Sequence, residues 1–131
     1  MKLRLAVALW IIGILFPLAW FSRMNPATKS LFNTVFASGW THVVMHSMLY
    51  AVLAMGLSLI WRGRQGEIQW RILGLVLLIG ITQEALQVLP FRTLPGLDSA
   101  FDLLVDLAGG TIGLLLPAWA WMQRRRKIRA V

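Results

Sequence analysis

Apolar residues gather along this chain into four long runs, which polar or charged connections separate. Each run is near the length of about 20 residues that crosses the hydrocarbon core of a bilayer as a helix, the first being the shortest. None shows the strict alternation of a membrane β-strand. Because backbone groups in lipid must be hydrogen-bonded within the protein, each run is predicted to be a transmembrane helix. The predicted spans are residues 5–21, 41–61, 72–89 and 101–121.

The composition supports a membrane protein. Hydrophobic residues make up 58% of the 131 residues and charged residues 14%, against about 45 to 50% and about 25% in soluble domains. The length allows four spans with short connections and no second folded domain. The fold class is therefore predicted to be all-α, a single membrane domain over residues 1–131. The absence of cysteine excludes disulfides, thiolate nucleophiles and cysteine-bound metal.

The formal charge of +8 comes from basic residues that flank the apolar runs, which is typical of membrane orientation and not of nucleic-acid binding. Ten of the 13 basic residues lie on one predicted side of the membrane. These are Lys2, Arg4, Arg62, Arg64, Arg71, Arg124, Arg125, Arg126, Lys127 and Arg129. The positive-inside rule therefore places both termini in the cytoplasm. Arg23, Lys29 and Arg92 fall on the other side.

The ends of the predicted spans carry tryptophan, which favours the headgroup level. Six of the seven tryptophans lie at or near such ends, and only Trp10 falls in mid-span. No small-x-small cleavage site follows the first run, so we expect it to be retained and not removed as a signal peptide. Residues 23–39 are expected to lie along the outer interface as a short amphipathic segment.

Ionisable residues inside these spans are the first indication of a functional site, because such groups are costly in hydrocarbon unless they face one another, water or a ligand. The predicted topology brings them to the outer half of the membrane. Residues three or four apart share a helix face. Three faces are involved: His42, His46 and Tyr50 on the first, Glu84 and Gln87 on the second, and Asp102, Asp106, Gly109 and Gly113 on the third.

The same residues, in this order, resemble the VanZ-like family, named for a teicoplanin-resistance protein. The matching pattern is His46-x-x-x-Tyr50, Glu84-x-x-Gln87, Pro90-x-Arg92, Asp102-x-x-x-Asp106 and Gly109-x-x-x-Gly113. The family usually has Asp-Lys where this chain has His42 and Val43, and Asn where it has Asp106. The resemblance implies a small multi-helix protein of a bacterial-type cytoplasmic (inner) membrane, linked to the cell envelope.

Each polar residue also has a structural interpretation. Asp102 follows Ser99 in an S-x-x-D pattern, so its role can be limited to stabilising the start of the helix, which is the alternative to ligand binding. Glu84 can pair with His46 or Arg92 between helices. His42, near the membrane boundary, is interpreted first as a hydrated interface residue and second as a ligand. Asp106 lies one turn deeper, where capping does not explain it, so a partnered or ligand-facing role is favoured.

Binding is the first functional hypothesis. An outward-facing polar pocket would hold an anionic lipid-linked or glycopeptide-related ligand, such as a lipid-linked envelope precursor, with the guanidinium of Arg92 on the anion. Tyr50, Gln87, Arg92 and Asp102 are the predicted ligand-binding residues, and Gly109 and Gly113 are predicted to pack helices closely. Membrane lipids are the expected partners, no nucleic acid is expected, and the oligomeric state is left open.

Two alternatives stay open. The first is a membrane enzyme in which His46, Glu84 and Asp106 are the catalytic candidates, His46 acting as acid or base oriented by a carboxylate. Neither a cofactor nor a metal is predicted. His42 and His46 are weak metal candidates, which with Glu84 and Asp106 would form a zinc set, but Val43 occupies the place of the glutamate in H-E-x-x-H. The second alternative is a small transporter.

Overall fold

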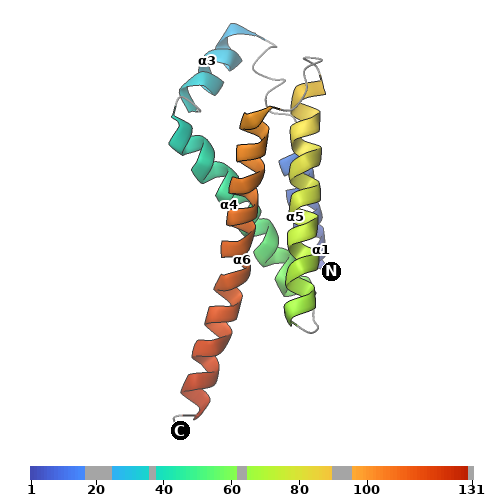
Figure 1. Cartoon of the computed structure of the whole chain (residues 1–131), viewed down its shortest axis with the longest axis vertical. Coiled ribbons are helices and arrows are strands. Elements are labelled where there is room, and N and C mark those ends of the chain that lie inside the picture. The colour runs from blue at the N-terminus through green and yellow to red at the C-terminus, as the bar shows by residue number, and fades with distance from the viewer. Residues whose placement is uncertain (17–24, 36–37, 62–64, 90–95, 130–131) are drawn as a thin grey trace.

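The fold was obtained as a computed structural model, which describes residues 1–16, 25–35, 38–61, 65–89 and 96–129. All regular secondary structure in these residues is helical, as predicted (Figure 1). The helices are α1 (Lys2–Leu15), α3 (Pro26–Val35), α4 (Gly39–Ile60), α5 (Gln65–Val88) and α6 (Leu97–Arg129).

Three of these helices are long and apolar enough to cross a membrane, namely Gly39–Ile60, Glu67–Val88 and the Leu97–Leu116 part of α6. No more than 33% of the most apolar stretch of any of them is buried inside the protein. Large apolar side chains such as Met48, Leu78 and Leu115 therefore face outward. Since a soluble protein would hide such faces, they indicate a membrane protein.

The predicted first span, residues 5–21, is described only in part. α1 covers Lys2–Leu15 with 14 residues, and residues 17–21 lie outside the described part of the chain. Its outer face is apolar, with Leu5, Leu9 and Ile12 exposed. On its inner face, Val7 and Ile14 are buried. Trp10, the one tryptophan in mid-span, donates its indole N–H to the backbone carbonyl of Leu49, 3.0 Å away.

Two predicted spans differ from the helices that contain them, because each of these helices extends beyond its apolar run. α5 begins at Gln65 and not at residue 72, and Glu67 in its first turn favours the positive end of the helix dipole. α6 begins at Leu97 and ends at Arg129, against the predicted 101–121, because arginine, lysine and glutamine favour helix although they are too polar for hydrocarbon. In the segment 23–39, Pro26–Val35 forms α3, with proline at the first helical position, which needs no N–H.

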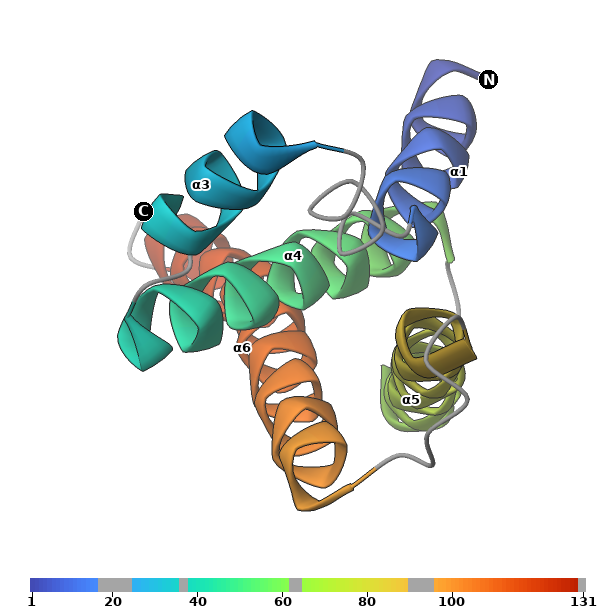
Figure 2. The same ribbon diagram turned by 90° about the horizontal axis from the view of Figure 1, so that it is seen from above.

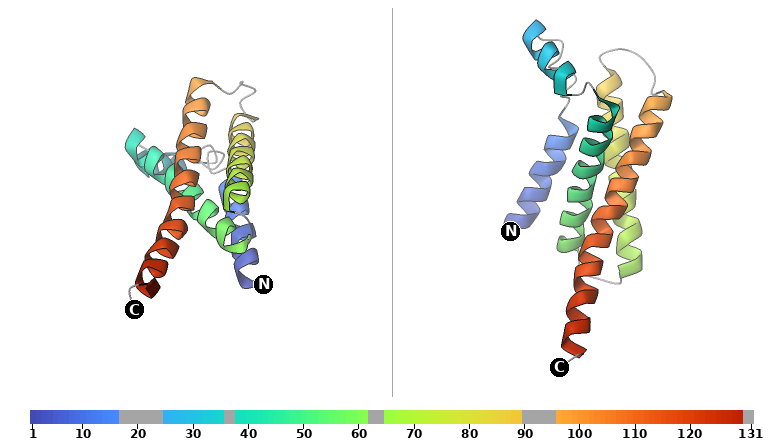
Figure 3. Two further views of the ribbon diagram at one scale, coloured as in Figure 1. Left: turned by 60° about the horizontal axis from the view of Figure 1, so that its bottom comes forward. Right: turned by 90° about the vertical axis from the view of Figure 1, so that its left-hand side faces the viewer.

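The helices form a bundle around α4. α4 packs most extensively against α6, and it also contacts α1 and α5. α4 and α6 run in the same direction and cross each other (Figures 1 and 2). The start of α1 and the end of α6 lie at one end of the bundle (Figure 3). The starts of α4 and α6 and the end of α5 lie together at the other end, which we call the polar end.

The core is apolar up to the polar end. Its fully buried members include Leu53 on α4 and Ile72 and Val76 on α5, joined by Leu57, Ile79 and Leu114. Towards the polar end, buried polar residues take the place of buried apolar ones. His46, Glu84, Ser99 and Asp106 are buried there, and all four are polar.

Candidate functional site

The site starts from the first turns of α4. Ser38 caps this helix by accepting a hydrogen bond from the backbone N–H of Trp40 at 3.2 Å. Helical spacing then places His42, His46 and Tyr50 on one face, each a turn deeper than the last. The side chain of His42 is 35% exposed and that of His46 7%. Tyr50 is fully buried, so this face runs from the surface into the core.

Two carboxylates on α6 meet the two imidazoles. His42 Nε2 lies 2.9 Å from Asp102 Oδ1, and His46 Nδ1 lies 2.9 Å from Asp106 Oδ1. The four residues are called the His–Asp cluster from here on. Both pairs are 60 positions apart in the chain, because α4 and α6 run in parallel and both repeat their polar residues every fourth position. The predicted convergence of these side chains is therefore confirmed.

Close packing of α4 against α6 lets such short side chains touch. A Cβ added at Gly109 would overlap the backbone of Ser47, and one added at Gly113 would overlap the backbone of Ala51. The helices thus approach at the two glycines with no side chain between them, which is the packing role predicted for the G-x-x-x-G pattern. One and two turns closer to the polar end, the same approach brings Asp106 and Asp102 to the histidines.

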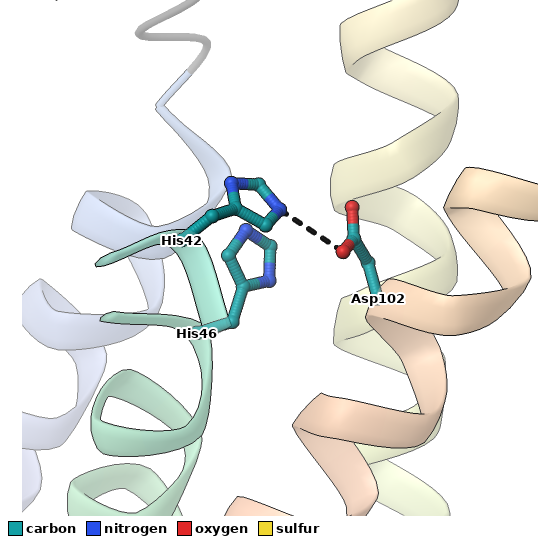
Figure 4. Close-up of side chains that lie close together, drawn as sticks. All are labelled: His42, His46 and Asp102. Atoms are coloured by element: carbon teal, nitrogen blue, oxygen red, sulfur yellow. Dashed lines mark hydrogen bonds and ion pairs between the residues drawn. The ribbon is translucent and has the colours of Figure 1, made fainter. Parts of the chain in front are cut away.

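The two imidazole rings lie together on the α4 side of the cluster. Their centroids are 4.3 Å apart and their planes are inclined by 34°. Figure 4 shows the His42 ring pointing to Asp102, with the His46 ring beneath it. An ionised carboxylate only accepts hydrogen bonds, so Asp106 fixes the ring proton of neutral His46 on Nδ1 and leaves the Nε2 lone pair available.

Two buried carboxylate oxygens, one in the His–Asp cluster and one on α5, lack a hydrogen-bond partner among the described residues. Glu84 on α5 is 5% exposed, and its carboxyl group interacts with Ser99 on α6. Among the described residues, Glu84 Oε1 and Asp106 Oδ2 have no hydrogen-bond partner. Gly80 on α5 packs closely against this part of α6, because a Cβ there would lie 2.8 Å from Leu103 Cδ2 and 3.0 Å from Asp106 Oδ2. These oxygens can accept hydrogen bonds from a ligand.

Two polar partners were not foreseen from the sequence. Gln83 Oε1 accepts a hydrogen bond of 2.7 Å from the Tyr50 hydroxyl, and Ser99 is buried beside Glu84. The available signal was that Gln83 adjoins Glu84 in an otherwise apolar run. Of the predicted ligand-binding residues, Gln87 is half-buried on α5, and Arg92 lies outside the described residues.

The capping interpretation of Asp102 is wrong in this structure. α6 begins at Leu97, so Asp102 stands well inside the helix, and its carboxylate contacts His42. The same contact shows that His42 is not simply a hydrated interface residue. The zinc set considered from the sequence also changes. Among the described residues, the three groups whose ligand atoms all lie within 4.8 Å of one another are His42, His46 and Asp102, so neither Glu84 nor Asp106 belongs to this set.

In comparisons with known proteins, no protein-family model, no curated protein and no solved structure matches this chain. The function has to be argued from the site itself.

Proposed function

We propose that this chain is a VanZ-like, multi-pass protein of a bacterial-type cytoplasmic membrane, with four membrane helices and both termini in the cytoplasm. The three apolar helices support the membrane location. The excess of basic residues at the termini and in the connection between α4 and α5 supports the orientation. In this orientation, the polar end and its His–Asp cluster face the outside of the cell.

The function that the geometry supports best is binding of an envelope amphiphile at the polar end, with its headgroup against the cluster. The observation that carries this proposal is the pair of buried carboxylate oxygens, Glu84 Oε1 and Asp106 Oδ2, that lack a partner among the described residues. Such atoms cost roughly 1 to 3 kcal/mol or more when nothing pairs with them. A ligand that donates hydroxyl or amide hydrogens would satisfy them.

The nature of the ligand follows from membrane location and charge. A lipid-linked cell-wall precursor or a glycopeptide-related molecule offers many hydroxyl and amide donors beside an anionic group. The described cluster carries acidic groups that suit the donors and would repel the anion. Arg92 is the residue that the sequence assigns to the anion, and its fork of donors suits a phosphate or carboxylate.

A membrane-embedded enzyme is the second candidate, and the bond between His46 Nδ1 and Asp106 Oδ1 at 2.9 Å favours it. A carboxylate that fixes the tautomer of an imidazole leaves Nε2 ready to take a proton from a substrate hydroxyl or water. In this case, His46 would be the base, Asp106 its positioning partner, and Glu84 a hydrogen-bond acceptor for the substrate.

Ligand binding can be tested with purified chain in lipid nanodiscs. The probe is a polyprenyl-diphosphate disaccharide-peptide, a lipid-linked wall precursor, and the readout is its affinity by native mass spectrometry. Replacing Glu84→Gln removes the buried charge and keeps the size. We expect the affinity to fall by about tenfold or more, since hydrogen bonds to charged groups are worth about 1.5 to 3 kcal/mol.

Glu67→Gln is the matched control. It makes the same chemical change on the same helix, at an exposed position at the opposite end of α5, and should leave the affinity unchanged. Equal affinity of wild type and Glu84→Gln, or equal losses in both variants, would contradict the proposal. Retention of helix content and of a single size-exclusion peak shows that each variant is folded.

A further inference from the structure

We propose that His42, His46 and Asp102 form a binding site for a divalent transition-metal cation, with zinc as the ion to test. This inference rests on the proposed function, because the cation would be the group that lets the acidic site hold an anionic headgroup. The three side chains come from two helices and gather at the polar end (Figure 4). Each offers one ligand atom, and all three atoms lie within 4.8 Å of one another.

The distances are close to those of a metal site. Zinc binds imidazole nitrogen at about 2.0 to 2.1 Å and carboxylate oxygen at about 2.0 to 2.2 Å. Two ligand atoms at such distances are roughly 2.9 Å apart at right angles and roughly 3.4 Å apart at the tetrahedral angle. His42 Nε2 and Asp102 Oδ1, at 2.9 Å, already have this spacing. The ligand atom of His46 lies within 4.8 Å of both of these atoms.

Asp106 supplies a second and independent observation. Histidines that bind a metal almost always donate their other ring N–H to a carboxylate, a carbonyl or a water. Asp106 is 1% exposed and accepts from His46 Nδ1 at 2.9 Å. With the ring proton on Nδ1, the Nε2 atom of His46, which is bonded to Cε1 next to Nδ1, keeps its lone pair for a metal. Asp106 therefore acts as a positioning residue, whereas Asp102, half-buried near the surface, is the ligand.

The ligand set indicates the kind of metal. Two imidazoles and one carboxylate suit zinc and other first-row transition ions better than calcium or magnesium, which prefer oxygen. Three protein ligands leave at least one coordination position open, as in sites that bind a substrate or water. Glu84 interacts electrostatically with His46 and Asp102, and its unpartnered Oε1 adds an acceptor near the site.

Such an ion would change which ligands the polar end can hold. The described site contains three carboxylates, on Glu84, Asp102 and Asp106, against two imidazoles. On its own this arrangement repels a phosphate or a carboxylate. A divalent cation reverses the local charge and offers an anionic oxygen a direct bond. Metal and anionic headgroup would then bind cooperatively at the cluster.

The test measures zinc in the purified full chain. The chain has only two histidines and both belong to the site, so a purification tag without histidine is required. After dialysis against zinc, elemental analysis should give one zinc per chain. X-ray absorption should show nitrogen and oxygen ligands at about 2.0 to 2.1 Å with the outer-shell signature of imidazole. Competition with a chelator gives the affinity.

Asp102→Asn and His42→Ala should each weaken zinc binding at least tenfold. Both residues are partly exposed, which limits the effect on folding, and helix content is measured for each. Asp106→Asn should weaken binding by roughly 10- to 100-fold, as outer partners of metal ligands do. Asp98→Asn is the matched control. It makes the same change at an exposed position on α6, four residues before Asp102, and should leave the affinity for zinc unchanged.

Absence of zinc from the wild type overturns the inference, and so does zinc that survives His42→Ala combined with His46→Gln, because that zinc is bound elsewhere. The two proposals fail separately. Binding of the wall precursor by a chain that takes no zinc overturns the metal site and leaves the proposed function standing. Stoichiometric zinc with no affinity for the precursor overturns the proposed function alone.

Discussion

Among single residues, Asp106 meets the strongest physical constraint. Its side chain is 1% exposed, one oxygen accepts from His46, and the other has no partner among the described residues. A buried charge is tolerated only when it is paired, and removing one partner of a buried pair costs about 3 to 5 kcal/mol. The imidazole of His46 is thus needed for the stability of the bundle.

We therefore predict that His46→Leu destabilises the protein by about 3 kcal/mol. The combined variant His46→Leu with Asp106→Leu should recover most of this loss, because replacing both partners by apolar groups removes the unpaired charge. Unfolding by titration with a denaturing detergent, followed by circular dichroism, measures both. A double variant no more stable than His46→Leu would contradict the prediction, because the loss would then not come from the unpaired carboxylate.

Among the helices, the contact between α4 and α6 determines the site. It depends on Gly109 and Gly113, where the backbones of Ser47 and Ala51 occupy the space of a side chain. The carboxylates of α6 reach the imidazoles of α4 only because no Cβ separates the helices at these points. Any larger residue there pushes the two rows of polar groups apart.

Gly113→Ala should accordingly destabilise the protein by about 1 to 3 kcal/mol, the usual cost of overpacking. Gly74→Ala is the control, since a Cβ at Gly74 on α5 meets nothing within 4 Å. In a helix interior, this second change should be neutral or stabilise the protein by up to about 1 kcal/mol. The measurement is the same detergent titration. Equal stability of both variants would mean that α4 and α6 do not approach each other closely at Gly113.

The sequence predicted some of these features better than others. The span 41–61 agrees closely with α4, Gly39–Ile60, because apolar run and helix end together there. The spacing of His42 and His46 and of Asp102 and Asp106 predicted the two faces that meet. The contacts of Gln83 with Tyr50 and of Glu84 with Ser99 escaped prediction, since the apolar residues of α5 show no periodicity from which the rotation of this helix can be inferred.

For the molecule as a whole, the orientation in the membrane decides from which side a ligand arrives. The chain has no cysteine, so single cysteines can report the accessible side. In the variant Asp98→Cys, the new thiol lies at the polar end and should react with a membrane-impermeant maleimide added to intact cells. In the variant Glu67→Cys, the new thiol lies at the opposite end of α5 and should react only after the cells are permeabilised. The reverse pattern would place the His–Asp cluster on the cytoplasmic side.

The equal separation of the two His–Asp pairs, 60 positions in each case, has one further consequence. Sliding α6 along α4 by one turn, about 5.4 Å, would set His42 opposite Asp106 and strand both His46 and Asp102. Every intermediate position breaks both bonds together. Both pairs therefore form together in only one alignment of the two helices, and a one-turn slip would keep a single pair and leave one histidine and one carboxylate unpaired.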